Sequence, residues 1–213
     1  MDDGIKTLVV GASGVGKSAS LRGLDPAKVS LINVIGKPLP FKGGNKFKSY
    51  NCDDPAKVES AIALAKTPIV VVDDAGYLIV DYFMRNHSSA GAGNGVFALY
   101  NALGDMYWNI INEAGKGKPG QRIYFMMQEE MNDFGKVKPK TIGKMLDEKV
   151  CIEGMFTIVL RAMFKDNKYI FRTQTDGLDV AKSPMGMFDD LEMDNDLALI
   201  DHKICEYYDI KGE

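Results

Sequence analysis

The sequence predicts an α/β fold of three layers, in which a mainly parallel β-sheet lies between helices and carries an antiparallel hairpin near the C-terminus. Apolar runs of strand length recur along the chain, at residues 5–10, 29–35, 69–74 and 122–128. Segments with apolar residues at helical spacing separate several of these runs. Strands that alternate with helices are typical of parallel sheets, because a crossover helix returns the chain to the same end of the sheet.

The helices and the hairpin can be placed along the chain. A short helix follows the first strand and ends near Gly23. Another begins at Pro55 with Asp54 as its N-cap, since proline and aspartate favour these two positions. Residues 86–95 are rich in glycine and predict a loop. Two further helices are predicted from helical spacing, one with Val96, Leu99, Leu103, Met106 and Ile110, and the last with Leu197, Ile200 and Ile204. The hairpin spans residues 156–175 and turns at Asp166-Asn167.

The length and composition predict one domain over residues 1–188, followed by an acidic segment and the last helix over 189–213. The net charge of −3 indicates that any nucleic-acid contact is local. The cysteines are odd in number and form no CxxC pair, which favours reduced thiols in a cytoplasmic protein. No apolar run approaches the roughly 20 residues that span a bilayer, and the N-terminus lacks the pattern of a signal peptide. We therefore expect a cytoplasmic protein without membrane contact.

Residues 11–18, GASGVGKS, follow the first predicted strand and match the spacing of a phosphate-binding P-loop. Glycines let the backbone N–H groups of such a loop surround a phosphate. Lys17, expected to face solvent, can reach the β- and γ-phosphates, and the Ser18 hydroxyl can bind Mg²⁺. The helix that follows points the positive end of its dipole at the same anion. The predicted nucleotide site consists of Gly11, Ala12, Ser13, Gly14, Val15, Gly16, Lys17, Ser18 and Ala19.

Candidates for catalysis follow two later strands. Asp73 ends an apolar run and is predicted to hold Mg²⁺ with Ser18, as a Walker B aspartate does; the alternative is a turn or capping aspartate. Asp74 either polarises the attacking water or caps a helix. Gln128 ends the next strand, where it either contacts the γ-phosphate or is a solvated strand end. Glu129 and the glutamate after it are further candidates for activating water.

The bound nucleotide is predicted to be ATP. A GTPase should carry an NKxD-type element that reads the base, and neither Asn45-Lys46 nor Asn167-Lys168 is followed by the aspartate of that element. A small nucleotide kinase would need a lid with arginines over the phosphates, and the arginines of this chain do not cluster in one loop. The sequence thus favours a Mg²⁺-dependent ATPase, which converts ATP and water to ADP and phosphate.

The order of these parts resembles the small phage-type RecA-like P-loop ATPases, a group that includes single-strand annealing proteins and phage nucleotide-binding AAA proteins. The resemblance covers roughly residues 5–188 and rests on GASGVGKS, IVVVDDAGYL, RIYFMMQEE and IFRTQTDGLDVAKSPMGMF. It implies a RecA-like core that binds ATP and Mg²⁺ and acts with single-stranded DNA in phage recombination or replication. It also implies a homo-oligomer with ATP at subunit interfaces, recombination or replication proteins of phage or host as partners, and the host cytoplasm as location.

The chain departs from this family at two points. Many members carry a glutamate soon after the second strand, whereas residues 36–52 contain no acid here. The strand that ends in Gln128 often ends in histidine in the family. Hydrolysis is therefore expected to be slow or to depend on Asp74 or Glu129. An ATP-gated assembly or regulatory module that hydrolyses ATP weakly and acts through protein partners is the alternative function, and a small nucleotide kinase is a weaker one.

Single-stranded DNA binding is predicted in the lysine-rich loop 37–48. Lysines can hold a DNA backbone while aromatic rings stack on bases, and this loop interleaves four lysines with Phe41 and Phe47. The alternative is a solvated connection with one phenylalanine in the core. The lysine-rich stretch from Lys136 to Lys149, which includes a short predicted helix, is the next candidate. Lys182 is a candidate for reaching a phosphate bound to a neighbouring subunit.

Overall fold

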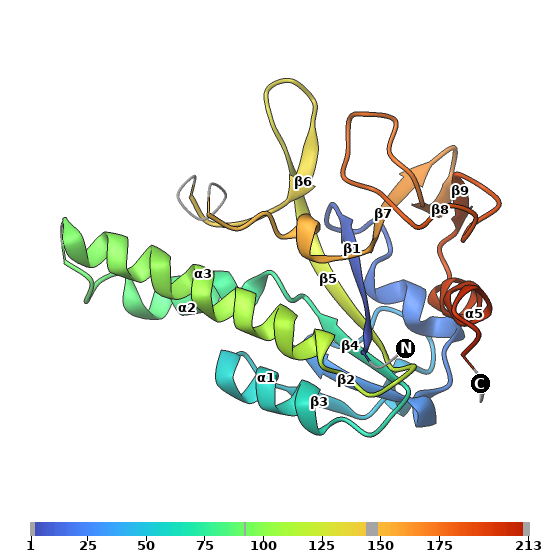
Figure 1. Cartoon of the computed structure of the whole chain (residues 1–213), viewed down its shortest axis with the longest axis horizontal. Helices are drawn as coiled ribbons and strands as arrows, with labels where there is room; N and C mark the ends of the chain where they lie inside the picture. The colour runs from blue at the N-terminus through green and yellow to red at the C-terminus, as the bar shows by residue number, and fades with distance from the viewer. Residues whose placement is uncertain (1–2, 92, 144–148, 211–213) are drawn as a thin grey trace.

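The computed structural model of the chain describes residues 3–91, 93–143 and 149–210 (Figure 1). Within these ranges the strands are β1 (Ile5–Gly11), β2 (Val29–Asn33), β3 (Ser49–Asn51), β4 (Ile69–Asp73), β5 (Arg122–Met131), β6 (Val137–Pro139), β7 (Ile158–Lys165), β8 (Lys168–Arg172) and β9 (Glu192–Asp194). The α-helices are α1 (Pro55–Leu64), α2 (Tyr77–Asn86), α3 (Asn94–Gly115) and α5 (Leu197–Tyr207). Short 3₁₀ helices are η1 (Ser18–Gly23), η2 (Pro26–Lys28), η3 (Gly44–Lys46) and η4 (Glu153–Met155).

The strands of the described ranges form one mixed sheet of nine strands, in the order β3-β2-β4-β5-β1-β7-β8-β9, with β6 paired to β5. The pairs from β3 to β7 along this order are parallel. β8 and β9 extend the sheet in antiparallel fashion, and β6 is also antiparallel to β5. The predicted α/β class, with a mainly parallel sheet and a C-terminal hairpin, is therefore confirmed.

The two faces of the sheet are covered by different helices, an arrangement compatible with a three-layer α/β fold (Figure 1). One buried cluster joins alternate residues of the central strands, such as Val70 and Val72, to α1, α2 and α3. The other joins the intervening residues, such as Ile69 and Val71, to η1 and α5. Because successive side chains of a strand point to opposite faces, an apolar run such as Ile69–Val72 fills both clusters.

Two local predictions are confirmed by the geometry. The Asp54 side chain accepts hydrogen bonds from the backbone N–H groups of Ala56 and Lys57, and α1 begins at Pro55. In the hairpin of β7 and β8, Asp166 and Asn167 have φ values of 49° and 61°. A two-residue turn needs this left-handed backbone at both positions, and aspartate and asparagine are among the residues that tolerate it.

Other elements differ from the prediction. The helix after the P-loop is a 3₁₀ helix of six residues, Ser18–Gly23, so its dipole is smaller than that of the α-helix expected there. α2 was not predicted, since its N-cap is Gly76, which has no side chain to give the usual start signal of a helix. β5 runs three residues past Gln128, because β6 pairs with its end. The short helix expected before Lys149 falls mainly on residues 144–148, which lie outside the described ranges.

The segment after residue 188 is built into the sheet and its core. β9 pairs with β8, and α5 buries Leu197 and Ile200 against the same cluster as β1. Asp201 of α5 accepts hydrogen bonds from Arg122 at 2.9 and 2.6 Å and from the Tyr124 hydroxyl at 2.5 Å. All three side chains are buried, so α5 is held to β5 by a charge pair with satisfied partners.

Candidate functional site

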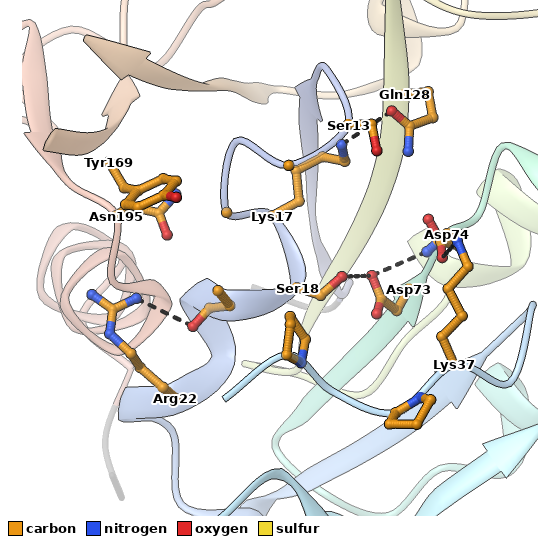
Figure 2. A pocket seen from close by; sticks show the side chains of 15 residues that line it. Ser13, Lys17, Ser18, Arg22, Lys37, Asp73, Asp74, Gln128, Tyr169 and Asn195 are labelled. Atoms are coloured by element: carbon orange, nitrogen blue, oxygen red, sulfur yellow. Dashed lines mark hydrogen bonds and ion pairs between the residues drawn. The ribbon is translucent and has the colours of Figure 1, made fainter. Parts of the chain in front are cut away.

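A cavity of about 450 Å³ lies where β1, β4 and β5 end in the direction of the chain (Figure 2). In open parallel sheets, ligands bind beyond these strand ends. Nine residues predicted for nucleotide binding or catalysis line the cavity: Ser13, Gly14, Gly16, Lys17, Ser18, Ala19, Asp73, Asp74 and Gln128. The structure therefore brings the motif 11–18 together with the acidic end of β4 and with Gln128 of β5.

The backbone of the motif requires glycine at three positions. Gly14 and Gly16 have φ values of 84° and 94°, which side chains other than glycine rarely adopt. A Cβ atom added to Gly11 would lie 2.7 Å from the carbonyl oxygen of Ala162 in the neighbouring strand β7. The glycines thus permit both the curvature of the loop and its close contact with the sheet.

Lys17 bridges the loop to the neighbouring strand. Its Nζ donates hydrogen bonds to the carbonyl oxygens of Gly11 and Ala12, both at 2.7 Å, and to Oε1 of Gln128 at 3.3 Å. The residue is only 7% exposed, so the expectation that it faces solvent is wrong. Burial lowers the pKa of Lys17, while the carboxylates of Asp74 and Asp73 oppose this change. The ammonium group is held beside the place where the loop would bind a phosphate.

The Ser18 hydroxyl and the Asp73 carboxylate meet in the cavity. Ser18 Oγ donates a hydrogen bond of 2.9 Å to Oδ1 of Asp73, as Figure 2 shows. Two ligands at right angles around Mg²⁺, each about 2.1 Å from the ion, lie about 3.0 Å apart, so the two oxygens fit this ion. Within the described ranges, no three His, Cys, Asp or Glu side chains come together to hold a metal. An ion here would therefore also need phosphate oxygens or water as ligands, as Mg²⁺ commonly does.

Burial gives Asp73 an unusual protonation equilibrium. The side chain is 4% exposed, and burial together with the neighbouring Asp74 raises its pKa to about 6. Hydrogen bonds from the Ser18 hydroxyl and the Asp74 backbone N–H, and the charge of Lys17, act in the opposite direction. Asp73 thus carries a charge at neutral pH that the protein destabilises, which is the condition that favours a cation as partner.

Asp74 directs its carboxylate into the cavity. Its φ of 56° is in the left-handed region, which is uncommon for residues other than glycine. Oδ2 lies 3.6 Å from Nζ of Lys37, which also lines the cavity. α2 begins after Gly76 without a side-chain cap, so the alternative that Asp74 caps this helix is wrong. The unusual backbone places a second carboxylate next to Asp73.

Gln128 and Glu129 point to opposite sides of β5. Gln128 pairs in register with Gly11 and lines the cavity, so it is not a solvated strand end. Glu129 does not line the cavity and forms a two-point ion pair with Arg161 of β7, at 2.9 and 3.1 Å. The next residue, Glu130, pairs with Lys138 of β6 at 3.2 Å. The structure does not bring either glutamate to the predicted site of water activation.

The aromatic residues of loop 37–48 are used in packing. Phe47 is 7% exposed and belongs to the core cluster of the η1 and α5 face. Phe41 is partly buried and packs edge-on against it, with the ring centroids 5.8 Å apart. Phe47 is therefore a core residue, as the alternative for this loop expects, and stacking on bases stays a prediction for Phe41 alone. All four lysines of the loop are exposed; Lys37 lines the cavity, whereas Lys42, Lys46 and Lys48 do not.

The other lysine candidates lie away from the cavity. The backbone of Lys182 exchanges hydrogen bonds of 2.8 and 2.9 Å with Val159 of β7. In the stretch from Lys136 to Lys149, Lys138 makes the ion pair with Glu130, and Lys144 lies outside the described residues. The cavity instead contains Arg22, Tyr169 and Asn195, which the sequence did not indicate, together with Lys37, Pro38 and Pro40 of loop 37–48. Asn195 lies between Asp194 and Asp196, so the one local feature that could have indicated its role is a neutral amide within an acidic stretch.

Comparisons with known proteins complete the description of the site. No protein-family model matches the chain, and a search of curated proteins found no significant match. Among the helices of the described ranges, none combines the length and apolar character needed to cross a membrane.

Proposed function

We propose that this protein is an ATP-binding P-loop ATPase of the RecA-like type that hydrolyses ATP with Mg²⁺. The observation that carries the proposal is the contact between the Ser18 hydroxyl and the Asp73 carboxylate at 2.9 Å, within a cavity also lined by Lys17. A glycine-rich loop alone can be a turn without a ligand. Asp73, however, ends a different strand, β4, and its carboxylate contacts the hydroxyl of the loop. Their convergence supports a shared Mg²⁺–phosphate ligand.

Different residues of the cavity have different roles in phosphoryl transfer. Backbone N–H groups of the loop bind the phosphate oxygens, and Lys17 neutralises charge on the β- and γ-phosphates. Ser18 and Asp73 would hold Mg²⁺, which would supply positive charge to neutralise the phosphate oxygens. Gln128 orients the water that attacks the γ-phosphorus, and Asp74 accepts a hydrogen bond from that water. The water oxygen forms a bond to the γ-phosphorus while the bond from that phosphorus to the bridging oxygen breaks, the proton of the water is transferred to the released phosphate, and ADP and phosphate leave.

A second candidate function is an ATP-gated assembly or regulatory module that hydrolyses ATP weakly. The observation in its favour is that Asp73 and Asp74 are the only carboxylates of the described residues that line the cavity. Lys37 enters the cavity after β2, where the related ATPases carry a glutamate, and Glu129 is engaged by Arg161. The Asp74 carboxylate is paired with Lys37 at 3.6 Å, so it is less free to accept a hydrogen bond from the attacking water, and hydrolysis is expected to be slow.

The biological setting follows from the resemblance to phage RecA-like ATPases. It supports a role in phage recombination or replication with single-stranded DNA, with the protein acting as a homo-oligomer in the host cytoplasm. The exposed lysines of loop 37–48 can hold a DNA backbone, although Phe47 lies in the core and only Phe41 is left to stack on a base. A small nucleotide kinase remains the weaker alternative, since the cavity is lined by a single arginine, Arg22, among the described residues.

The experiment that tests the proposal measures ATP turnover and ATP binding with and without single-stranded DNA. Turnover that DNA stimulates supports the DNA-dependent ATPase, whereas tight Mg²⁺-dependent binding without turnover supports the assembly module. Phosphate transfer to an added nucleotide would support the kinase. Lys17→Ala should abolish each of these signals, and Lys66→Ala, on an exposed lysine after α1, is the matched control. Equal ATP binding by the wild type and Lys17→Ala would refute the proposal.

A further inference from the structure

The cavity continues beyond the P-loop on the side opposite to Asp73. Figure 2 shows Tyr169, Asn195 and Arg22 at one end of the site and Asp73, Asp74 and Gln128 at the other, with Lys17 between them. A second cavity of about 380 Å³ shares Arg22, Tyr169 and Asn195 with the first. The recess therefore extends past the place for the phosphates, in the direction that the rest of a nucleotide would take.

Asn195 is the unusual residue at this end. It is 1% exposed, and neither its side-chain oxygen nor its side-chain nitrogen has a hydrogen-bond partner. Its backbone N–H donates to the Tyr169 carbonyl, so β9 places the residue without help from the side chain. A buried amide without partners is unfavourable, and most buried polar groups in proteins are paired. An alanine would fit the same backbone without this penalty, so packing alone does not account for the carboxamide.

The carboxamide and the Tyr169 ring both lie against the P-loop. A Cβ atom added to Gly16 would lie 3.1 Å from Oδ1 of Asn195 and 3.1 Å from Cδ1 of Tyr169. Tyr169 is 51% exposed, and its ring packs on Phe164 of the facing strand with the centroids 4.7 Å apart. One end of the cavity thus combines a partly exposed aromatic ring with a donor and an acceptor that lack partners.

We infer that Asn195 and Tyr169 form the nucleobase subsite of the nucleotide site, and that this subsite reads adenine. This inference rests on the proposed function, because it assumes that the P-loop holds the phosphates. A carboxamide can donate one hydrogen bond to a ring nitrogen of adenine and accept one from its amino group. The Tyr169 ring offers a face on which the base stacks. Binding of the base then satisfies the two polar atoms that the free protein leaves unpaired.

The test compares ATP, GTP and inorganic tripolyphosphate as ligands of the wild type, Asn195→Ala and Asn101→Ala. Asn101 is exposed on α3 and lines neither cavity, so it is the matched control. Asn195→Ala should weaken ATP binding by about 10- to 100-fold, because a two-point contact to a base is lost. Tripolyphosphate has no base, so its affinity should not change. The ratio of ATP to GTP affinity should fall toward one.

A second variant pair separates stacking from folding. Tyr169→Phe keeps the ring and should bind ATP like the wild type, whereas Tyr169→Ala should weaken ATP and leave tripolyphosphate unchanged. The melting temperature of Asn195→Ala should not fall, because the side chain makes no hydrogen bond in the free protein.

The outcomes distinguish this inference from the proposed function. If wild-type binding of ATP and tripolyphosphate depends on Lys17 but Asn195→Ala leaves the ATP to GTP ratio unchanged, the subsite is refuted and the P-loop function stands. Equal loss of ATP and tripolyphosphate in Asn195→Ala would also refute it, since the residue would then act on the loop. If the wild type binds neither ligand, both the proposed function and the subsite are overturned.

Discussion

Asp73→Asn is expected to stabilise the free protein while it removes Mg²⁺-dependent activity. The rise of the Asp73 pKa from 3.8 to about 6 on folding corresponds to about 3 kcal/mol of lost stability when the group is ionised. Both hydrogen bonds that the carboxylate accepts go to Oδ1, which asparagine retains. Asp73 lines the cavity, and we allow about 1 kcal/mol for the weaker solvation of the new amide nitrogen. The variant should therefore be more stable than the wild type by about 2 kcal/mol at pH 7.5.

The sign of the pH dependence follows from the direction of the pKa change. Between pH 4 and 6 the folded protein holds a proton on Asp73 that the unfolded chain has lost. The free energy of unfolding of the wild type therefore loses this contribution as the pH rises through this range, and the contribution is absent in Asp73→Asn. At pH 4.5 the carboxyl is protonated in the folded protein but mostly ionised in the unfolded chain, so about 1 kcal/mol of the destabilisation remains. This amount cancels the allowance for the amide, so the difference between the two proteins should nearly vanish at pH 4.5.

The assay is urea unfolding of both proteins at pH 4.5 and 7.5, without nucleotide and then with ATP and Mg²⁺. Asp105→Asn, on an exposed carboxylate of α3, is the control and should change neither curve. ATP with Mg²⁺ at 100 times the dissociation constant should stabilise the wild type by about 2.7 kcal/mol and the variant much less. A variant that is less stable than the wild type at pH 7.5, or a difference that does not depend on pH, would refute the reasoning.

Three further predictions test other parts of the site. Lys17→Ala should weaken ATP at least about 100-fold in equilibrium binding, as a buried charge-assisted contact to phosphate is lost, while circular dichroism stays native; unchanged affinity would contradict this. Asp74→Asn should lower turnover at least about 10-fold in a phosphate-release assay. Glu129→Gln should keep turnover and lower the melting temperature, because Arg161 loses an ionic partner. The opposite pattern would assign water activation to Glu129. If loop 37–48 binds single-stranded DNA, the triple replacement of Lys42, Lys46 and Lys48 with alanine should lower the slope of log affinity against log salt by up to about 2 and leave ATP affinity intact. An unchanged slope would place the DNA site elsewhere.

The parts of the fold that depend on local sequence were predictable. The strand before the P-loop, the N-cap at Asp54 and the turn at Asp166-Asn167 each depend on a few neighbouring residues, and the structure has all three. The convergence of Ser18 with Asp73 was also predictable, because a motif with known partners places them at the same end of a parallel sheet.

Features that depend on distant contacts were not predictable. Glu129 follows Gln128 directly, yet the alternation of the strand sends it to Arg161, a partner that the sequence does not identify. Phe47 was a candidate for stacking on DNA bases, but the fold places its ring in the core. Asn195 reaches the P-loop only because β9 pairs with β8 at the edge of the sheet. Long-range pairing decides each of these positions, and no local pattern records it.

The position of β1 has a consequence for the order in which the candidate site can be assembled during synthesis. The P-loop directly follows β1, but the strands that flank β1 are β5 and β7, which lie far downstream in the chain. Asn195, which lies against Gly16, is translated later still. A ribosome-bound chain whose translation has not passed Asn195 therefore has the loop without one of its walls, and we expect ATP binding only after that residue has been made.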